Sequence, residues 1–243
     1  MLKVNYFGKT DVGLVRPNNE DTFLIKPDIG FCLVSDGMGG AAAGELASRI
    51  FTETALEVFS ADRDQSENRT VEKVKKAFRS AHERILKYVK GNPHHQGMGC
   101  TAELIAFHEQ GFVIGHIGDS RIYRVRNGQL KQITKDHSLI QDQIDRGLIT
   151  PAEAKKHSLR NIILRAVGIN GSLALDILMG KTYAGDLFLL CSDGLTDMID
   201  DHLIGQALYS DMALTQKTEK LVEMAISAGG KDNITVVLAE CNS

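Results

Sequence analysis

The 243-residue chain has few cysteines and prolines, no long apolar run and no excess of basic residues. Its 4 cysteines are scattered and form no CxxC pair, so we expect no disulfide framework and a reducing compartment. No window approaches the roughly 18 apolar residues of a membrane span, and residues 1–10 carry no signal-peptide stretch. The sequence therefore predicts a complete cytoplasmic chain, although a soluble piece of a longer membrane protein would show the same pattern.

The charge balance argues against a nucleic-acid partner. The 28 basic and 31 acidic residues give a formal net charge of -3, whereas binding DNA or RNA phosphates normally requires a basic excess. Hydrophobic residues make up 43% of the chain and prolines number only 4, which is typical of a globular protein rather than a linker-rich one. At about 150 residues per domain, the length allows one large domain or two small ones with a sizeable core.

Hydrophobic patterns predict an α+β fold. Seven runs rich in branched and aromatic residues predict strands that are mostly antiparallel neighbours: 4–7, 31–34, 104–107, 112–117, 122–125, 187–190 and 234–238. Asn127-Gly128 separates the run 122–125 from the run 129–133, and both residues tolerate the positive φ of a type I′ hairpin turn. Strands before and after paired helices favour α+β over a regular alternation of strand and helix.

Three apolar stripes predict helices. The stripe over 71–89 recurs at steps of three and four residues, and it must pack on a sheet. Similar stripes lie within 44–60 and just before Gly229-Gly230. The polar segment 136–167 carries two short helical patterns between strands, the second opened by Thr150-Pro151 in a capping arrangement. This segment is either a mobile flap or an ordinary helical connection.

Acidic residues recur at the ends of the predicted strands. Asp36 and Asp193 each follow an apolar run within the tripeptide Ser-Asp-Gly. The complete set of loci is Glu20 with Asp21, Asp36, Asp119, Asp193 and Asp232. A lone Asp-Gly pair is usually only a turn, but five loci beside strands predict carboxylates that meet at one edge of the fold.

Carboxylates that meet need a compensating charge. At about 4 Å and an effective dielectric of about 20, each pair costs about 4 kcal/mol. Protonation relieves the repulsion by raising pKa values, and divalent cations relieve it more completely. Oxygen ligands without histidine or thiolate favour Mg²⁺ or Mn²⁺ over zinc. Gly37 has no Cβ, so its carbonyl would be able to approach such an ion.

Other phosphate and hydrolase motifs are missing from the sequence. Gly8-Lys9-Thr10 and Gly180-Lys181-Thr182 end like a P-loop but lack its first glycine, and we predict turns at both. No cysteine is followed six residues later by arginine, which excludes a cysteine-nucleophile phosphatase. The chain also contains no HExxH and no GxSxG, so zinc peptidases and α/β-hydrolases lack their central motifs.

Six motifs in order resemble those of the metal-dependent protein phosphatases, the protein phosphatase 2C-like (PPM) family, in its bacterial serine/threonine form. They are RPNNED at 16–21, SDGMGG at 35–40, GMGCT at 97–101, GDSR at 118–121, SDGLTD at 192–197 and GKDNIT at 230–235. Each motif alone is weak, but six in the right order over about residues 13–237 are specific. The resemblance implies one catalytic domain, 1–243, built as a four-layer α-β-β-α sandwich of two antiparallel sheets, with a flap at about 136–167.

The resemblance also implies a centre of two Mn²⁺ or Mg²⁺ ions. Asp36 would bridge both ions and the Gly37 carbonyl would hold one of them. Asp193 and Asp232 would hold the other. Three further acids have weaker roles in this family pattern: Glu20 and Asp21, which assist directly or through water, and Asp119, which matches a possible third metal site.

Arg16 matches the arginine that grips the substrate phosphate through its planar fork, although a surface charge beside a turn is the simpler reading of the residue alone. Together with Asp36 and Asp193, it forms the implied catalytic set. In the implied reaction, a water bridging the two ions loses a proton, attacks phosphorus in line and releases serine or threonine.

The implied partners are phosphorylated proteins and an opposing serine/threonine kinase, for a monomer that binds neither nucleic acid nor membrane. A catalytically silent phosphoprotein binder and a hydrolase of small phosphate esters are the alternatives. The chain departs from some family members at Met38 and Ala41, where a histidine would donate the proton to the leaving group. A metal-bound water or the pair His94-His95 would then have to serve, and Cys100, where threonine is common, is predicted to be a packing residue.

Overall fold

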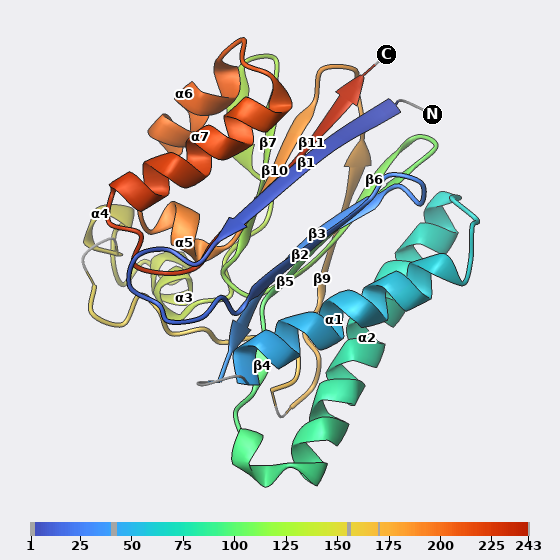
Figure 1. The fold of residues 1–243 in the computed structure, drawn as a ribbon, viewed down its shortest axis with the longest axis vertical. Helices are drawn as coiled ribbons and strands as arrows, with labels where there is room; N and C mark the ends of the chain where they lie inside the picture. Colours follow the sequence, from blue (N-terminus) through green and yellow to red (C-terminus); the bar gives the residue numbers. More distant parts are fainter. Residues whose placement is uncertain (1–2, 40–42, 155–156, 170, 243) are drawn as a thin grey trace.

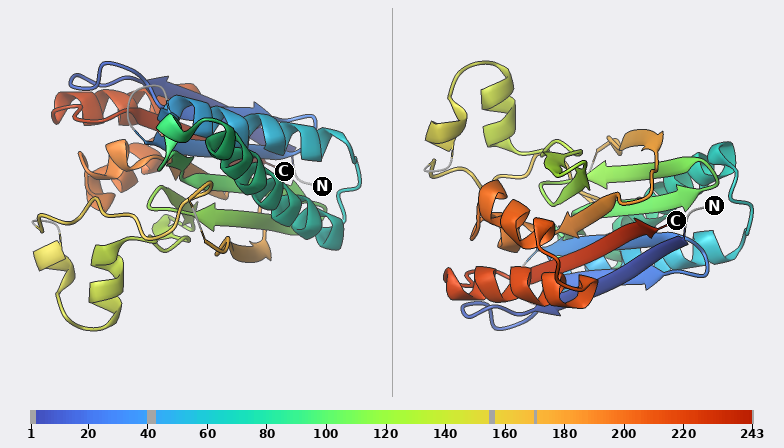
Figure 2. Two further views of the ribbon diagram at one scale, coloured as in Figure 1. Left: turned by 90° about the horizontal axis from the view of Figure 1, so that it is seen from below. Right: turned by 90° about the horizontal axis from the view of Figure 1, so that it is seen from above.

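The computed structural model describes residues 3–39, 43–154, 157–169 and 171–242. Two antiparallel sheets stack face to face, and helices cover both outer faces (Figures 1 and 2). This arrangement confirms the predicted α+β sandwich. Ala41 and the last residue of the motif 35–40 lie outside the described residues. Within the described ranges, no helix is both long and apolar enough to span a membrane.

The first sheet has five strands in the order β1-β11-β10-β7-β8. Their bounds are β1 Lys3–Asp11, β11 Ile234–Asn242, β10 Leu187–Cys191, β7 Arg121–Arg126 and β8 Gln129–Gln132. Helices α6 (Asp201–Tyr209) and α7 (Leu214–Ser227) cover its outer face. Leu221 and Val222 of α7 pack there against buried side chains of β10 and β11, as the apolar stripe before Gly229 predicts.

The second sheet has the order β2-β3-β5-β6-β9, and a short strand β4 pairs with β3. Their bounds are β2 Asp21–Lys26, β3 Phe31–Met38, β4 Gly99–Cys100, β5 Ala102–His108, β6 Gly111–Ile117 and β9 Asp176–Lys181. Helices α1 (Ala43–Ser60) and α2 (Glu67–Gly91) cover its outer face and are followed by a 3-10 turn, Pro93–His95. Between the two sheets, Phe107, Phe112 and Phe188 interlock edge to face in a buried layer.

The segment 136–167 forms a lobe beside the sandwich, clearest in Figure 2. It contains α3 (Leu139–Asp145) and α4 (Pro151–Ala154), and the predicted cap is present because Thr150 and Glu153 exchange hydrogen bonds. The two ends of the lobe meet, since the Leu139 amide donates to the Ile162 carbonyl and Cys100 pairs with Val167. The lobe is therefore tied to the sandwich at a narrow base.

Of the three turns predicted from glycine patterns, one is confirmed. The Asn127-Gly128 turn is confirmed, with φ values of 52° and 70° between β7 and β8. The turns predicted at Gly8-Lys9-Thr10 and Gly180-Lys181-Thr182 are wrong, because Gly8 lies inside β1 and Gly180 inside β9. At each glycine, an aromatic ring from a neighbouring strand occupies the place of a Cβ, Phe23 over Gly8 and Phe112 over Gly180.

Candidate metal centre

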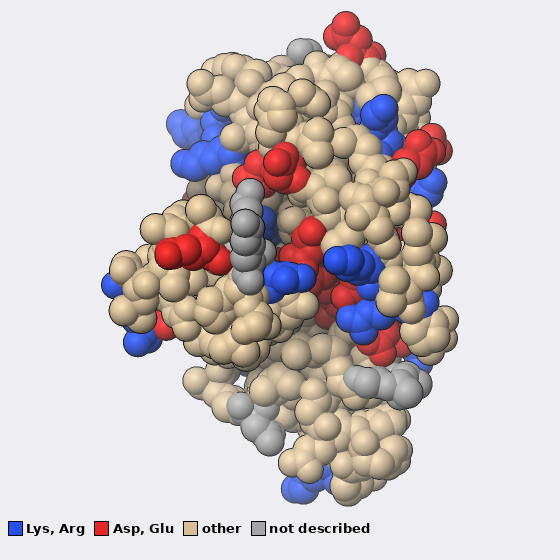
Figure 3. Space-filling view, turned by 90° about the vertical axis from the view of Figure 1, so that its left-hand side faces the viewer, with Lys and Arg blue, Asp and Glu red and all other residues tan. Residues whose placement is uncertain are grey.

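The strands bring the acidic loci to one end of the sandwich. Asp21 begins β2 and lies directly opposite Asp36 on β3. From the other sheet, Asp193 follows β10 as the first residue of α5 (Asp193–Thr196), and Asp232 precedes β11. Figure 3 shows Asp and Glu side chains gathered at the centre of this face, with Lys and Arg side chains beside them.

Mutual repulsion and burial dominate the electrostatics of these acids. Burial raises the pKa of Asp36 well above its ordinary value, and four carboxylates raise it further: Asp21, Asp193, Asp119 and Asp232. The pKa of Asp193 is also raised well above the ordinary value, first by burial and then by Asp119 and Asp232. The acids that the sequence places at separate strand ends therefore feel one another's charge.

Asp21 and Asp119 show smaller shifts. Burial raises the pKa of Asp21 to about 6, although hydrogen bonds from Thr235 and Ser192 favour its ionised form. Burial also raises the pKa of Asp119 to about 7, and the charge of Asp136 adds to the shift. At neutral pH, repulsion and burial thus oppose full ionisation of the cluster without a cation.

Three carboxylate oxygens in this cluster are buried and have no hydrogen-bond partner among the described residues: Asp21 Oδ1, Asp119 Oδ1 and Asp193 Oδ1. An unpartnered buried oxygen is costly, and a hard divalent cation is the partner that suits it. In the part of the chain that the structure describes, no three Asp, Glu, His or Cys side chains are grouped closely enough to hold a metal ion. Other oxygens of the cluster have protein partners instead. Ser192 donates to Asp21, and Arg16 and the Asn233 amide donate to the two oxygens of Asp232. The oxygen donors fit Mn²⁺ or Mg²⁺ in kind.

Gly37 lies where the first turn of α1 meets β3. A Cβ at Gly37 would collide with the carbonyl oxygen of Gly44, so only glycine fits this contact. The Gly37 amide donates to the Glu20 carbonyl at 3.1 Å. The Glu20 carboxyl carbon and the Gly37 carbonyl oxygen both lie 2.8 Å from the place of a Cβ on Gly44, so these two oxygen donors are neighbours. Burial raises the pKa of Glu20, and Arg16 opposes the shift.

Arg16 lies over the acids from the loop before β2. Its Nη2 is 2.6 Å from Asp232 Oδ2, and half of its side chain is exposed, at 50%. The hydrogen bond with Asp232 raises the pKa of the arginine further, so the guanidinium is always charged. Arg16 thus places a positive charge at the rim of the acidic cluster, where a ligand that approaches from solvent can reach it.

Sequence reasoning missed the role of Asn233. Its Oδ1 accepts from the Glu20 amide at 2.8 Å, and its Nδ2 donates to the carbonyls of Val12 and Asn18 at 3.0 and 2.9 Å. One buried side chain therefore fixes the loop that carries Arg16 to the start of β11. Its place directly after Asp232 in a motif was the only available signal.

Thr101 has a similar supporting role that the sequence left unassigned. Its amide donates to the Asp36 carbonyl at 2.8 Å, and its hydroxyl accepts from the Asp36 amide at 3.1 Å. The same hydroxyl lies 2.8 Å from the Ser120 hydroxyl, next to Asp119. Thr101 thus connects the backbone of Asp36 to the side chain that follows Asp119.

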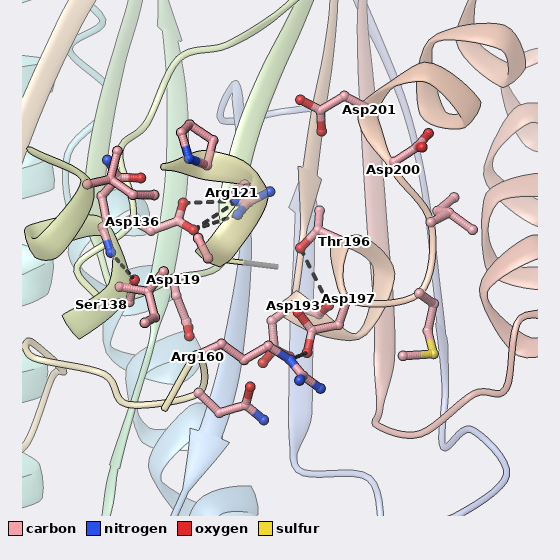
Figure 4. Close-up of a pocket in the computed structure, with 18 of the residues that line it drawn as sticks. Asp119, Arg121, Asp136, Ser138, Arg160, Asp193, Thr196, Asp197, Asp200 and Asp201 are labelled. Carbon is pink, nitrogen blue, oxygen red and sulfur yellow. Dashed lines mark hydrogen bonds and ion pairs between the residues drawn. The ribbon is translucent and has the colours of Figure 1, made fainter. Parts of the chain in front are cut away.

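A pocket of about 830 Å³ opens beside the acids, between the lobe and the α5–α6 region (Figure 4). Asp119 and Asp193 line it together with apolar and polar side chains of the lobe. Arg121 holds Asp136 in a fork, with nitrogen–oxygen distances of 2.9 and 2.7 Å. Arg160 reaches from the lobe to within 3.7 Å of Asp197. The volume lies within the range of about 300–1,000 Å³ that is usual for ligand pockets.

The histidine pair His94-His95, considered as a proton donor, and Cys100, predicted to be a packing residue, make no ionic contact with these acids among the described residues. The His95 ring stacks on Tyr88 at 5.5 Å, and no hydrogen bond links His94 or His95 to the acidic cluster among the described residues. Cys100 is fully buried, and burial raises the pKa of its thiol to about 12. It is a packing residue, as predicted.

Residues 16–238 match the sequence profile of the family described as Protein phosphatase 2C. The chain belongs to the protein phosphatase 2C family. This 2C-family chain is 38% identical over 239 residues to the serine/threonine protein phosphatase PstP of Mycobacterium tuberculosis. The match covers 98% of this chain but only 45% of PstP, so the chain spans less than half the length of that relative. It is 37% identical over 241 residues to the protein phosphatase PhpP of Streptococcus pneumoniae, with 96% of each chain covered.

Solved structures of 2C-family relatives have the same fold. The serine/threonine phosphatase PstP/Ppp of Mycobacterium tuberculosis superimposes with a TM-score of 0.92 at 38% identity, covering 99% of both chains. A catalytic domain of PstP, solved in complex with two manganese ions, has a TM-score of 0.91 at 36% identity and covers 100% of both chains.

Proposed function

We propose that the chain is a metal-dependent protein serine/threonine phosphatase that hydrolyses phosphoserine and phosphothreonine in proteins. The observation that carries the proposal is the group of buried carboxylate oxygens without partners at one end of the 2C-family sandwich. Relatives named serine/threonine protein phosphatases support the reaction, and the two manganese ions in a structural relative support the ion count. Mn²⁺ or Mg²⁺ would serve as the cofactor.

The proposed ligand set is the one that the family resemblance implies. Asp36 would be shared by two ions, with the Gly37 carbonyl on one of them. Asp193 and Asp232 would hold the other. The remaining acids have assisting roles in this proposal: Glu20, Asp21 and, for a weaker third ion, Asp119.

When bound, the ions would supply an activated water as nucleophile and neutralise charge on the phosphate. The chain's own groups orient the reaction. Arg16 would exchange its contact with Asp232 for a two-pronged contact with the phosphate, because an ion on Asp232 removes the need for a protein cation there. Ser192 would keep Asp21 in place by donating to its Oδ2 at 2.7 Å.

We also propose that residues 1–243 act as one catalytic domain, with the lobe 136–167 as its flap over the pocket. The substrates would be phosphorylated proteins, and an opposing serine/threonine kinase would supply them. We propose a monomer that acts in the cytoplasm. The size of the pocket beside the acids, about 830 Å³, supports a polypeptide substrate rather than a free phosphate alone.

The test is hydrolysis of a phosphothreonine peptide in Mn²⁺, with and without EDTA, against a nucleotide as competing substrate. We expect metal-dependent peptide hydrolysis, faster than nucleotide hydrolysis and lost in EDTA. Peptide binding without turnover would indicate a silent phosphoprotein binder. Preferential nucleotide turnover would indicate a hydrolase of small phosphate esters.

A further inference from the structure

His137 contacts three separate parts of the chain at the base of the lobe. Its amide donates to the Gly118 carbonyl at 2.7 Å, and its Nδ1 accepts from the Gly118 amide at 3.2 Å. Its carbonyl accepts from the Leu164 amide, at the returning end of the lobe, at 2.7 Å. Its Nε2 lies 3.1 Å from an oxygen of Asp176, the first residue of β9. The residue is buried, with 8% of its surface exposed.

These contacts fix the proton on the imidazole. A backbone N–H only donates, so Nδ1 must be unprotonated to accept from Gly118. The proton therefore sits on Nε2 and is donated to Asp176. Arg165 Nη1 also lies 3.2 Å from Nε2, but it cannot donate to a protonated nitrogen and instead pairs with Asp176 at 3.4 Å. Burial lowers the pKa of His137 to about 4, and the charge of the neighbouring His116 contributes to the shift. His137 is thus neutral, which the bond from Gly118 requires.

His116 supports this arrangement from the sheet below. Its ring lies 4.4 Å from the His137 ring, and its Nε2 donates to the Lys135 carbonyl at 2.8 Å. Its Nδ1 lies 2.6 Å from Glu103 Oε1, and both side chains are fully buried. Burial lowers the pKa of His116, but Glu103 raises it more, to about 9. Burial also raises the pKa of Glu103 to about 7. The buried hydrogen-bonded pair Glu103–His116 in β5 and β6 therefore anchors the chain two residues before His137.

Gly118 is the residue through which this base reaches the metal centre. It precedes Asp119, has a φ of 123°, and a Cβ on it would lie 2.5 Å from the Thr101 Cβ. The Gly118 N–H, in the peptide that precedes Gly118, donates to the His137 ring, and the Gly118 carbonyl, in the peptide that leads into Asp119, accepts from the His137 backbone amide. The ring and the backbone of His137 therefore hold the two peptides on either side of Gly118. Asp119 and Arg160 of the lobe line the same pocket (Figure 4).

We propose that His137 is a positioning residue that sets the Gly118–Asp119 turn and the base of the 136–167 lobe in one fixed relation. The lobe and the Asp119 carboxylate then face each other across the pocket at a constant spacing. The part of the inference that concerns catalysis rests on the proposed function. The structural coupling between the two segments does not.

Two substitutions separate the hydrogen bonds of His137 from its bulk. His137→Phe keeps a ring but deletes both side-chain bonds, whereas His137→Asn keeps an acceptor near the place of Nδ1. His108→Phe is the matched control, because His108 is also buried and its Nδ1 also accepts from a backbone amide, that of Gln110 at 3.4 Å. His108 ends β5, about 20 Å along the strand from the acidic end.

The first measurement is amide hydrogen exchange of the full chain, with and without Mn²⁺. We expect His137→Phe to speed exchange at least 10-fold in both 117–121 and 162–167, with His137→Asn close to wild type. His108→Phe should leave both segments unchanged. Unchanged exchange in His137→Phe, or the same increase in His108→Phe, would overturn the proposal.

The second measurement is the Mn²⁺ concentration that gives half-maximal phosphopeptide hydrolysis. We expect it to rise about 10-fold in His137→Phe, since partners that orient a ligand typically change metal affinity by about 10- to 100-fold. His137→Asn should restore most of the affinity. A fall in thermal stability with an unshifted Mn²⁺ requirement would mean that His137 is merely structural. An inactive wild type would refute the proposed function and leave the exchange result to decide the coupling.

Discussion

The chain contains the tripeptide Ser-Asp-Gly twice, once in each sheet, and the two copies differ in structure. At 35–37 the tripeptide continues β3, whereas at 192–194 it leaves β10 and begins α5. Both aspartates reach the same acidic cluster. Both glycines lie against backbone, because a Cβ on Gly37 would collide with the Gly44 carbonyl and one on Gly194 with the Asn233 carbonyl. The same tripeptide thus brings an aspartate to the acidic cluster in two different local conformations.

The serines show what the difference means. Ser35 Oγ donates to the Thr101 carbonyl at 2.7 Å, next to its own strand. Ser192 Oγ donates to Asp21 of the other sheet at 2.7 Å and accepts from the Thr235 amide at 3.0 Å. The second copy is therefore a joint between the two sheets at the metal centre, and the first copy is not.

The aspartates should be equivalent in function, and this is the largest effect we predict. Asp36→Asn and Asp193→Asn should each lower Mn²⁺-dependent phosphopeptide hydrolysis by more than about 100-fold, beyond the usual loss from residues that only orient a ligand. Thermal melting in EDTA should show no loss of stability, because each change removes one repelling charge. Full activity of either variant would remove that residue from the ligand set.

The glycines should be equivalent in stability. Gly37→Ala and Gly194→Ala should each reduce the free energy of unfolding by about 3 kcal/mol, because the added methyl meets rigid backbone. Gly91→Ala is the control, since open space surrounds its Cβ position at the end of α2. Urea unfolding would measure all three. A loss below about 0.5 kcal/mol at Gly37 or Gly194 is what surface substitutions show and would contradict the contact.

The serines should differ. Ser192→Ala leaves a buried carboxylate oxygen and the Thr235 amide without their partner, so we expect a loss of about 1–3 kcal/mol. Ser35→Ala removes one bond to a carbonyl, and we expect about 1 kcal/mol. Ser192→Ala should also raise the Mn²⁺ requirement, because the pKa of Asp21 loses a group that lowers it. Equal effects of the two changes on metal dependence would contradict the joint between the sheets.

The metal-free protein should also show a pH dependence of its stability. The pKa values of Asp21 and Asp119 are raised to about 6 and about 7, so the folded state binds protons more tightly than the unfolded state. Their stabilising contribution is full below the unfolded pKa of about 4 and is lost as the pH rises through 6 and 7. The melting temperature in EDTA should therefore fall as the pH rises from 5 to 8.

Metal should reverse this trend, because Mn²⁺ competes with the same protons. The Mn²⁺ concentration for half-maximal activity should decrease as the pH rises from 6 to 8. Asp21→Asn is the control that should reduce the slope in EDTA. A melting temperature that rises steadily with pH in EDTA would contradict the raised pKa values.

The sequence predicts the parts of this structure that depend on local pattern. The apolar stripes give α1, α2 and α7, and the strand ends give the positions of the acids. The long-range contacts were not predictable, because the partner of Ser192 lies 171 residues away in the sequence. Gly8 was assigned to a turn for the same reason, since Phe23, which covers it, belongs to another strand. The triple contact of His137 likewise depends on segments that only the fold brings together.

Strand β9 was missed because it is only partly buried and lacks a long apolar run. The short helices of the lobe were predicted, but the contacts that close its base were not. Its two helices match the short helical patterns in the sequence, and the predicted Thr150 cap opens α4, whereas the Ser138 cap of α3 was not predicted. Its closure at the base follows from backbone bonds, such as that between Leu139 and Ile162, which leave no pattern in the sequence.

The most direct test is the manganese anomalous signal from crystals of the chain grown in excess Mn²⁺. We expect two strong peaks at the acidic end of the sandwich, one beside Asp36 and the Gly37 carbonyl and the other among Asp36, Asp193 and Asp232. Well-ordered carboxylates with no manganese peak between them would contradict this expectation.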